Sequence, residues 1–181
     1  MQFYVVSDDY ITHLKTVDKH VPNNYGETRP YIGVVMEINN IKYLAPLTSH
    51  KEKHNEIKAG IPTVFKMHEL GNEDNKLGMV QINNMLPILD SEVELLNMEA
   101  QSKPYQRLLN LQQQFLRKNK DRFIKKARKL YMLVTEKKVP GLVKNCCDFK
   151  ALEKAMKTFT SEIEKDVSQE KLNALVGMFK N

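Results

Sequence analysis

The chain has 181 residues, of which 41% are hydrophobic, and a formal net charge of +6. This length fits one hydrophobic core and leaves little room for two independent domains, and the composition excludes a disordered or fibrous chain. The positive charge favours a polyanionic partner, because Lys and Arg gain affinity by releasing phosphate counterions. A basic protein without such a partner is the alternative that charge alone leaves open.

Cysteine usage and hydropathy bear on the compartment. Cys146 and Cys147 are neighbours, so a disulfide between them would be strained, and they show no zinc-binding spacing. The first residues lack the basic start and apolar run of a signal peptide. The longest apolar run, around Tyr31–Ile38, is interrupted by Glu37 and is too short to cross a membrane. We therefore expect a cytoplasmic protein that makes no contact with a membrane.

The first half of the chain alternates short β-branched and aromatic runs with Asn, Gly and Pro, which predicts strands and loops. We expect a strand over Phe3–Ser7 and a short helix over Asp9–Val17. The runs Tyr31–Ile38 and Lys42–Leu47 flank Asn39-Asn40, a pair that tolerates the positive φ of a tight turn. These runs predict a β-hairpin.

Three more strands are expected before the helical half. They cover Pro62–Met67, Gly78–Ile82 and Met85–Leu89, and the polar stretch His68–Lys76 is expected to be a loop. Pro87 has no backbone N–H to donate, which favours an edge position or a bulge. The first half therefore predicts a β-rich core.

From Lys103 the apolar residues recur about every 3.6 residues, which predicts two long helices before Pro140-Gly141. Further amphipathic helices are expected over Phe149–Phe159 and Ser161–Phe179. The two long helices carry a basic run that is either a solvated face or an RNA-facing surface: Arg107, Arg117, Lys118, Lys120, Arg122, Lys125, Lys126, Arg128 and Lys129. We expect a single α+β domain over residues 1–181, mainly β with a short helix over 1–98 and helical over 99–181.

The most reactive stretch, Leu44–Asn55, begins in a predicted strand and continues past its end, where rigid scaffolds display functional groups. RNA cleavage needs a proton acceptor for the ribose 2′-hydroxyl, a proton donor for the departing 5′ oxygen and positive groups for the phosphorane, so no metal is required. Ser49, Thr48 and Lys51 can hold and neutralise the phosphate. Arg29 can present its planar guanidinium to the phosphate oxygens. The identities of the general base and acid stay open.

Other chemistries fit this stretch less well. His50 and His54 lie four residues apart, but the order His-Lys-Glu-Lys-His is not that of a zinc protease, and the lysines would repel a cation. Neither Gly-x-Ser-x-Gly nor a phosphate-binding glycine loop occurs in the sequence, which disfavours serine hydrolases and nucleotide-binding enzymes. We expect no metal and no cofactor.

A particular order of motifs runs along about residues 1 to 135. It consists of Phe3-Tyr4 with Tyr10, then Tyr31–Val35, then Lys42–Ser49 with Lys51, His54 and Asn55, and then Leu77-Gly78 with Met85–Ile88. This order resembles the ToxN/AbiQ family of type III toxin–antitoxin endoribonucleases.

The resemblance implies a fold like that of the MazF and CcdB toxins, a strongly bent antiparallel sheet or SH3-like barrel with appended long helices. It implies metal-independent, sequence-selective cutting of adenine-rich RNA by 2′-hydroxyl attack, which leaves a 2′,3′-cyclic phosphate. The implied partner is an antitoxin RNA of short tandem repeats, which the enzyme processes into pseudoknots that inhibit it in a closed protein–RNA assembly. Such systems defend bacteria against phage by abortive infection.

The resemblance also implies site residues. Ser49 matches the family's essential serine, with Thr48 and Lys51 beside it, and Tyr10 matches a tyrosine of the motif. Arg29 and Tyr25 fall where some members have a lysine and a tyrosine. Tyr10 can orient the phosphate or stack on a base, or it can anchor its helix in the core. The residues expected to bind RNA are Tyr25, Lys53, His54, Asn55, Arg107, Arg117, Lys118 and Lys125.

Two other functions stay open at this point. A non-catalytic RNA-binding regulator would use the same basic surface and would show salt-sensitive RNA binding without a cyclic-phosphate product. A CcdB-like inhibitor of DNA gyrase would act by protein contact without damage to RNA.

Overall fold

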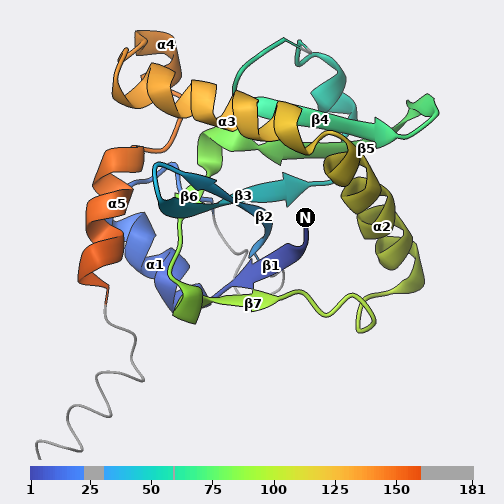
Figure 1. The fold of residues 1–181 in the computed structure, drawn as a ribbon, viewed down its shortest axis with the longest axis horizontal. Helices are drawn as coiled ribbons and strands as arrows, with labels where there is room; N and C mark the ends of the chain where they lie inside the picture. The colour runs from blue at the N-terminus through green and yellow to red at the C-terminus, as the bar shows by residue number, and fades with distance from the viewer. Residues whose placement is uncertain (23–30, 59, 160–181) are drawn as a thin grey trace, which may run out of the picture.

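The computed structural model describes residues 1–22, 31–58 and 60–159. In these residues an antiparallel sheet combines with helices, which makes the fold α+β (Figure 1). The strands are β1 (Phe3–Val6), β2 (Tyr31–Ile38), β3 (Ile41–Thr48), β4 (Val64–Glu69), β5 (Asn72–Gln81), β6 (Leu86–Pro87) and β7 (Val93–Leu95). The helices are α1 (Asp8–Val17), α2 (Lys103–Lys118), α3 (Lys120–Thr135), α4 (Pro140–Val143) and α5 (Phe149–Thr158), with 3₁₀ turns η1 (Glu52–Asn55), η2 (Ile82–Asn84) and η3 (Asp90–Glu92). The helix predicted over 161–179 lies outside the described residues.

Strand β3 lies at the centre of the sheet, whose order is β4-β5-β3-β2-β1-β7. Along one edge β3 pairs with β2. Along its other edge Tyr43 and Leu44 pair with β6, and Leu47 and Thr48 pair with β5. All of these pairings are antiparallel. The last residue of β3, Thr48, is therefore fixed against β5, and the chain that follows it leaves the sheet there.

The predicted hairpin of β2 and β3 is confirmed. Asn39 and Asn40 have φ angles of 50° and 61°, as expected for a tight turn with both central residues in the left-handed region. The predicted edge position of Pro87 is also confirmed, because it lies in the two-residue strand β6, which pairs with β3 alone among the described strands.

The prediction of a loop over His68–Lys76 is wrong. Strand β4 ends at Glu69 and β5 begins at Asn72, so most of this stretch belongs to a hairpin that turns at Gly71. The first half of β5 is exposed on both faces, and its residues therefore lack the alternation by which a half-buried strand is recognised. The strand predicted over Met85–Leu89 shortens to β6.

Helix α2 lies at one end of the sheet, α1 and α5 lie at the other, and α3 runs between them (Figure 1). Helix α2 packs against β4 and β5, while α1 and α5 pack against each other and α5 also contacts β6. Phe123 and Phe149, from α3 and α5, are among the largest fully buried side chains. None of the helices in the described residues has the length and apolar character that crossing a membrane needs.

A buried carboxylate ties α5 to the rest of the core. Glu153 accepts hydrogen bonds from the hydroxyls of Tyr43 on β3 and Tyr131 on α3, at 2.6 Å each, and from Lys150 Nζ at 2.9 Å. Burial alone would raise the pKa of Glu153, but these hydrogen bonds outweigh it and hold the pKa below its usual value. Glu153 therefore stays charged, and three elements converge on it.

Candidate active site

The segment Thr48–Asn55 begins at the last residue of the central strand β3 and ends in the turn η1. Thr48 is held in the sheet by its pairing with Met79, and its hydroxyl donates to the main-chain oxygen of Ser49 at 3.4 Å. Ser49 and Lys51 are exposed. The structure therefore brings together three of the predicted catalytic residues, Thr48, Ser49 and Lys51, on one short segment.

Gly78 of β5 lets this segment approach the sheet closely. It has a φ of +114°, a conformation that residues with a Cβ atom rarely adopt. A Cβ atom at this position would lie 2.0 Å from the main-chain oxygen of Thr48 and 3.0 Å from the main-chain nitrogen of His50. The absence of a side chain at Gly78 therefore sets the position of the segment that carries Ser49.

His54 fastens the other end of the segment. Its Nδ1 accepts a hydrogen bond from the main-chain N–H of Lys51 at 3.2 Å, and its own main-chain N–H donates to the oxygen of Lys51 at 2.8 Å. Burial, followed by the neighbouring His50 and lysines, lowers the pKa of His54. The imidazole is therefore neutral at neutral pH, with its proton on Nε2.

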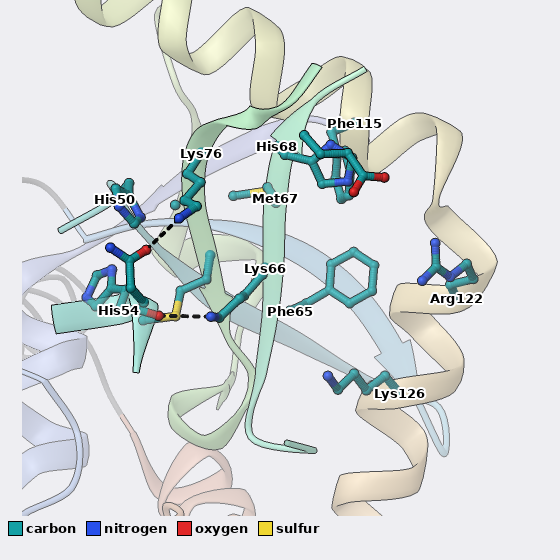
Figure 2. A pocket seen from close by; sticks show the side chains of 14 residues that line it. His50, His54, Phe65, Lys66, Met67, His68, Lys76, Phe115, Arg122 and Lys126 are labelled. Carbon is teal, nitrogen blue, oxygen red and sulfur yellow. Dashed lines mark hydrogen bonds between the residues drawn. The ribbon is translucent and has the colours of Figure 1, made fainter. Parts of the chain in front are cut away.

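Two lysines of the β4–β5 hairpin donate hydrogen bonds to residues of η1. Lys66 Nζ donates to the main-chain oxygen of His54 at 2.9 Å, and Lys76 Nζ donates to Asn55 Oδ1 at 2.8 Å (Figure 2). These bonds join η1 to both strands of the hairpin. They also place two ammonium groups beside the segment that carries Ser49.

A pocket of about 470 Å³ lies over strands β4 and β5, next to this segment. Figure 2 shows His50 and His54 on one side of the hairpin and Arg122 and Lys126 of α3 on the other. Ser49 and Lys51 precede and follow His50 in the chain and are exposed, but they are not among the residues that line the pocket. The lining residues are His50, His54, Asn55, Phe65, Lys66, Met67, His68, Glu73, Lys76, Gly78, Met79, Phe115, Arg122 and Lys126.

The electrostatic character of the pocket is positive. Lys66, Lys76, Arg122 and Lys126 line it, and Glu73 is the one carboxylate among its described lining residues. Burial, followed by the charge of Arg122, lowers the pKa of Lys126, as expected where cations gather without enough anions. An anion in the pocket would relieve this repulsion.

The far wall of the pocket is aromatic. The ring of His68 lies edge-on to Phe115 with centroids 4.7 Å apart. His68 Nδ1 donates to the main-chain oxygen of Glu69 at 3.0 Å, which in the neutral ring leaves the lone pair on Nε2. The pocket thus combines cations, proton acceptors and an apolar wall, which suits a segment of nucleic acid.

Tyr10 is not part of this cluster. Its side chain is fully buried, lies edge-on to Phe159, and donates its hydroxyl proton to the main-chain oxygen of Pro87 at 2.8 Å. Burial, with a smaller effect of Glu92, raises the pKa of Tyr10 above its usual value. In this position Tyr10 is a core anchor of α1 and cannot reach a phosphate at Ser49, so the structure does not support the catalytic role expected from the sequence.

The other expected residues are dispersed. Arg29 and Tyr25 lie outside the described residues, so their proposed roles rest on the sequence. Lys53 is exposed on η1 and Asn55 binds Lys76 at the pocket, while Arg117 lines a different cavity. Arg107, Lys118 and Lys125 are exposed on α2 and α3 and line neither cavity.

Sequence reasoning missed Lys66, His68 and Lys76. Lys66 lies within the strand that was predicted over Pro62–Met67, whereas His68 and Lys76 lie at the two ends of the stretch that was expected to be a loop. The alternation of Phe65 and Met67 with Lys66 and His68 is typical of a strand and could have identified the pocket wall.

The sequence matches the family described as toxin ToxN of type III toxin–antitoxin systems over residues 2–157. The chain belongs to the ToxN family. This match confirms the resemblance found in the sequence. The chain is 40% identical to the endoribonuclease ToxN of Pectobacterium atrosepticum, over 91% of this chain and 96% of that protein. It is 30% identical to the endoribonuclease AbiQ of Lactococcus lactis subsp. lactis, over 84% of this chain and 86% of that protein.

Solved structures of ToxN-family proteins share the fold. One comes from a bacterial antiviral system regulated by a processed non-coding RNA; it is 38% identical, with a TM-score of 0.80 over 89% of this chain and 100% of that chain. Another comes from a type III system in which a non-coding RNA pseudoknot inhibits the toxin; it is 32% identical, with a TM-score of 0.74 over 86% of this chain and 95% of that chain.

Proposed function

We propose that this ToxN-family chain is an endoribonuclease toxin that an RNA antitoxin holds inactive. The observation that carries the proposal is the Thr48–Asn55 segment, which lines a cationic pocket with His50, His54 and Asn55 and exposes the Ser49 hydroxyl and the Lys51 ammonium on either side of His50 in the chain. Relatives that match nearly the whole chain are named endoribonucleases, and this supports RNA as the polyanion.

The reaction follows from what the segment offers. The ribose 2′-hydroxyl attacks the adjacent phosphorus, the bond to the 5′ oxygen breaks, and the upstream product ends in a 2′,3′-cyclic phosphate. Ser49 and Thr48 position the phosphate by hydrogen bonds, and Lys51 with Arg29 stabilises the charge that develops on its oxygens. The imidazoles of His50 and His68 line the same pocket and can accept a proton there. Each of these steps proceeds without a metal ion.

Substrate and inhibitor share one surface in this proposal. The substrate is adenine-rich single-stranded RNA in the cytoplasm. The inhibitor is an antitoxin RNA of tandem repeats, which the toxin cuts into pseudoknotted units that fill the basic surface in a closed protein–RNA assembly. Structures of relatives from an RNA-regulated antiviral system and from a pseudoknot-inhibited type III system support this mode of inhibition.

The biological outcome is defence against phage by abortive infection. A relative with a TM-score of 0.77 is described as a lactococcal anti-phage endoribonuclease of a type III system, which supports this role. We also propose that the bent sheet of this chain corresponds to the SH3-like barrel of the MazF and CcdB toxins.

The test compares two serine substitutions. Ser49→Ala removes the exposed hydroxyl next to His50, whereas Ser102→Ala removes an exposed hydroxyl that makes no capping hydrogen bond to α2. We expect the wild type and Ser102→Ala to cut single-stranded RNA in EDTA and to arrest growth when produced without antitoxin, and Ser49→Ala to do neither. Growth arrest by Ser49→Ala at equal expression, or gyrase inhibition without RNA damage, would refute the proposal.

A further inference from the structure

A second cavity lies at the α2–α3 junction, next to strands β1 and β2. Its volume is about 600 Å³. Arg117, Lys120 and Arg128 line this cavity, which we call the β1–α3 groove, and Glu37 is the one carboxylate among its described lining residues. The groove therefore carries an excess of positive charge, like the pocket that contains His54.

Helix α3 separates the groove from the pocket. Arg122 and Lys126, four residues apart, line the pocket. Lys120, Ile124 and Arg128, spaced in the same way, line the groove. At about 100° per residue, the two rows are turned by roughly 180° from each other around the helix axis. The pocket and the groove thus flank α3 on opposite sides.

The solvent face of α3 connects the two cavities. Lys125 and Lys129 are exposed and lie at intermediate angles between the two rows. Apart from Asp121, which is exposed on this face in the first turn of α3, the charged residues around the exposed half of the helix from the pocket to the groove are cations. A helix with its side chains is about 10 to 12 Å across, a width that a few nucleotides of an extended strand can cross.

We propose that the β1–α3 groove is a second RNA-binding site, which holds phosphates of the strand that continues beyond the bond cut at the pocket. This inference rests on the proposed function, because it takes the pocket as the place of cleavage. Three cations against one carboxylate suit a phosphodiester backbone. The half-buried ring of Tyr4 and the half-buried side chain of Ile124 offer apolar surface to a base. The groove thus extends the RNA contact by several nucleotides.

The test uses two single-stranded RNAs of different length whose riboses are 2′-O-methylated, so that neither can be cut. The short one fills the pocket alone, and the long one also reaches the groove. In the double variant Arg117→Gln/Arg128→Gln we expect the affinity for the long RNA to fall by about tenfold or more and the affinity for the short RNA to stay unchanged. The slope of log affinity against log salt for the long RNA should become shallower by about 1.4, since two phosphate contacts are lost.

The matched control is Lys154→Gln/Lys157→Gln, which removes the same charge from exposed positions on α5, at the other end of the molecule (Figure 1). This control should bind both RNAs as the wild type does. Equal loss of affinity for the two RNAs in the groove variant, or loss for neither, would overturn the proposal. Because the methylated RNAs cannot react, a protein that fails to cut ordinary RNA but shows the length-dependent loss would refute the proposed function and leave the groove assignment standing.

Discussion

Replacement of Gly78 by alanine tests whether close packing against β5 positions the reactive segment. The new Cβ atom would lie 2.0 Å from the main-chain oxygen of Thr48, so the segment must retreat by about 1.5 Å to reach van der Waals distance. A misplacement of about 1 Å at a reacting group can cost about 10²-fold in rate. The positive φ adds a strain of about 1 to 3 kcal/mol, which lowers the free energy of unfolding.

Gly71→Ala is the matched control, because Gly71 also has a positive φ, +84°, but faces open space in the β4–β5 turn. Both variants should lose unfolding free energy in denaturant titrations, and Gly78→Ala should lose more because its Cβ atom also clashes with the main chain of Thr48. We expect Gly78→Ala alone to lose about 10²-fold in the rate of RNA cleavage when both are assayed below their unfolding transitions. Full cleavage by a folded Gly78→Ala protein, or equal loss in both variants, would refute the reasoning.

Three further substitutions test neighbouring parts of the structure. The side-chain oxygen of His54→Asn can accept the Lys51 N–H, so it should keep most of the cleavage rate that His54→Ala loses. Because the pKa of His54 is lowered from 6.5, its hydrogen bond stabilises the fold above that pH and is lost as the pH falls through the lowered pKa. Cleavage by the wild type should therefore decline more on acidification than cleavage by His54→Asn, as pH–rate profiles would show. Tyr10→Phe removes the hydrogen bond to the main-chain oxygen of Pro87, so it should lower the free energy of unfolding by about 1 kcal/mol and leave the cleavage rate unchanged. A large loss of cleavage rate without loss of stability would instead support a catalytic role for Tyr10. Glu153→Gln should lower the free energy of unfolding by about 1.5 to 3 kcal/mol at neutral pH and by much less in acid. The reason is that the lowered pKa of Glu153 gives the wild type stability that it loses as the pH falls through that pKa. Thermal unfolding at several pH values measures both differences, and an equal loss at every pH would contradict this reasoning.

Local patterns in the sequence predicted those elements that lie half-buried against the core. The Asn39-Asn40 turn and the 3.6-residue period of α2 and α3 each report a local constraint that the chain satisfies without distant partners. The β4–β5 hairpin was missed because the first half of β5 projects into solvent on both faces, so its residues show no period of two.

Some residues of the candidate site could likewise be predicted from the local sequence, whereas others depend on the tertiary fold. Thr48, Ser49 and Lys51 are adjacent in sequence and could be grouped from the motif alone. The contributions of Lys66, Lys76 and the cations of α3 depend on the sheet order, which places β4 and β5 beside the end of β3. Tyr10 shows the converse, because its helical spacing left both a core anchor and a contact to the phosphate open, and only its packing and its hydrogen bond to Pro87 distinguish the two.

The chemical ends of the RNA products test the proposed cleavage at the Thr48–Lys51 segment most directly. Wild-type protein should cut a single-stranded RNA in EDTA and leave a 2′,3′-cyclic phosphate, as mass spectrometry of the upstream fragment would show. Placing a single 2′-deoxyribose before the cut should abolish cleavage at that bond. Fragments that end in a 3′-hydroxyl, or unchanged cleavage at the 2′-deoxy position, would contradict attack by the ribose hydroxyl.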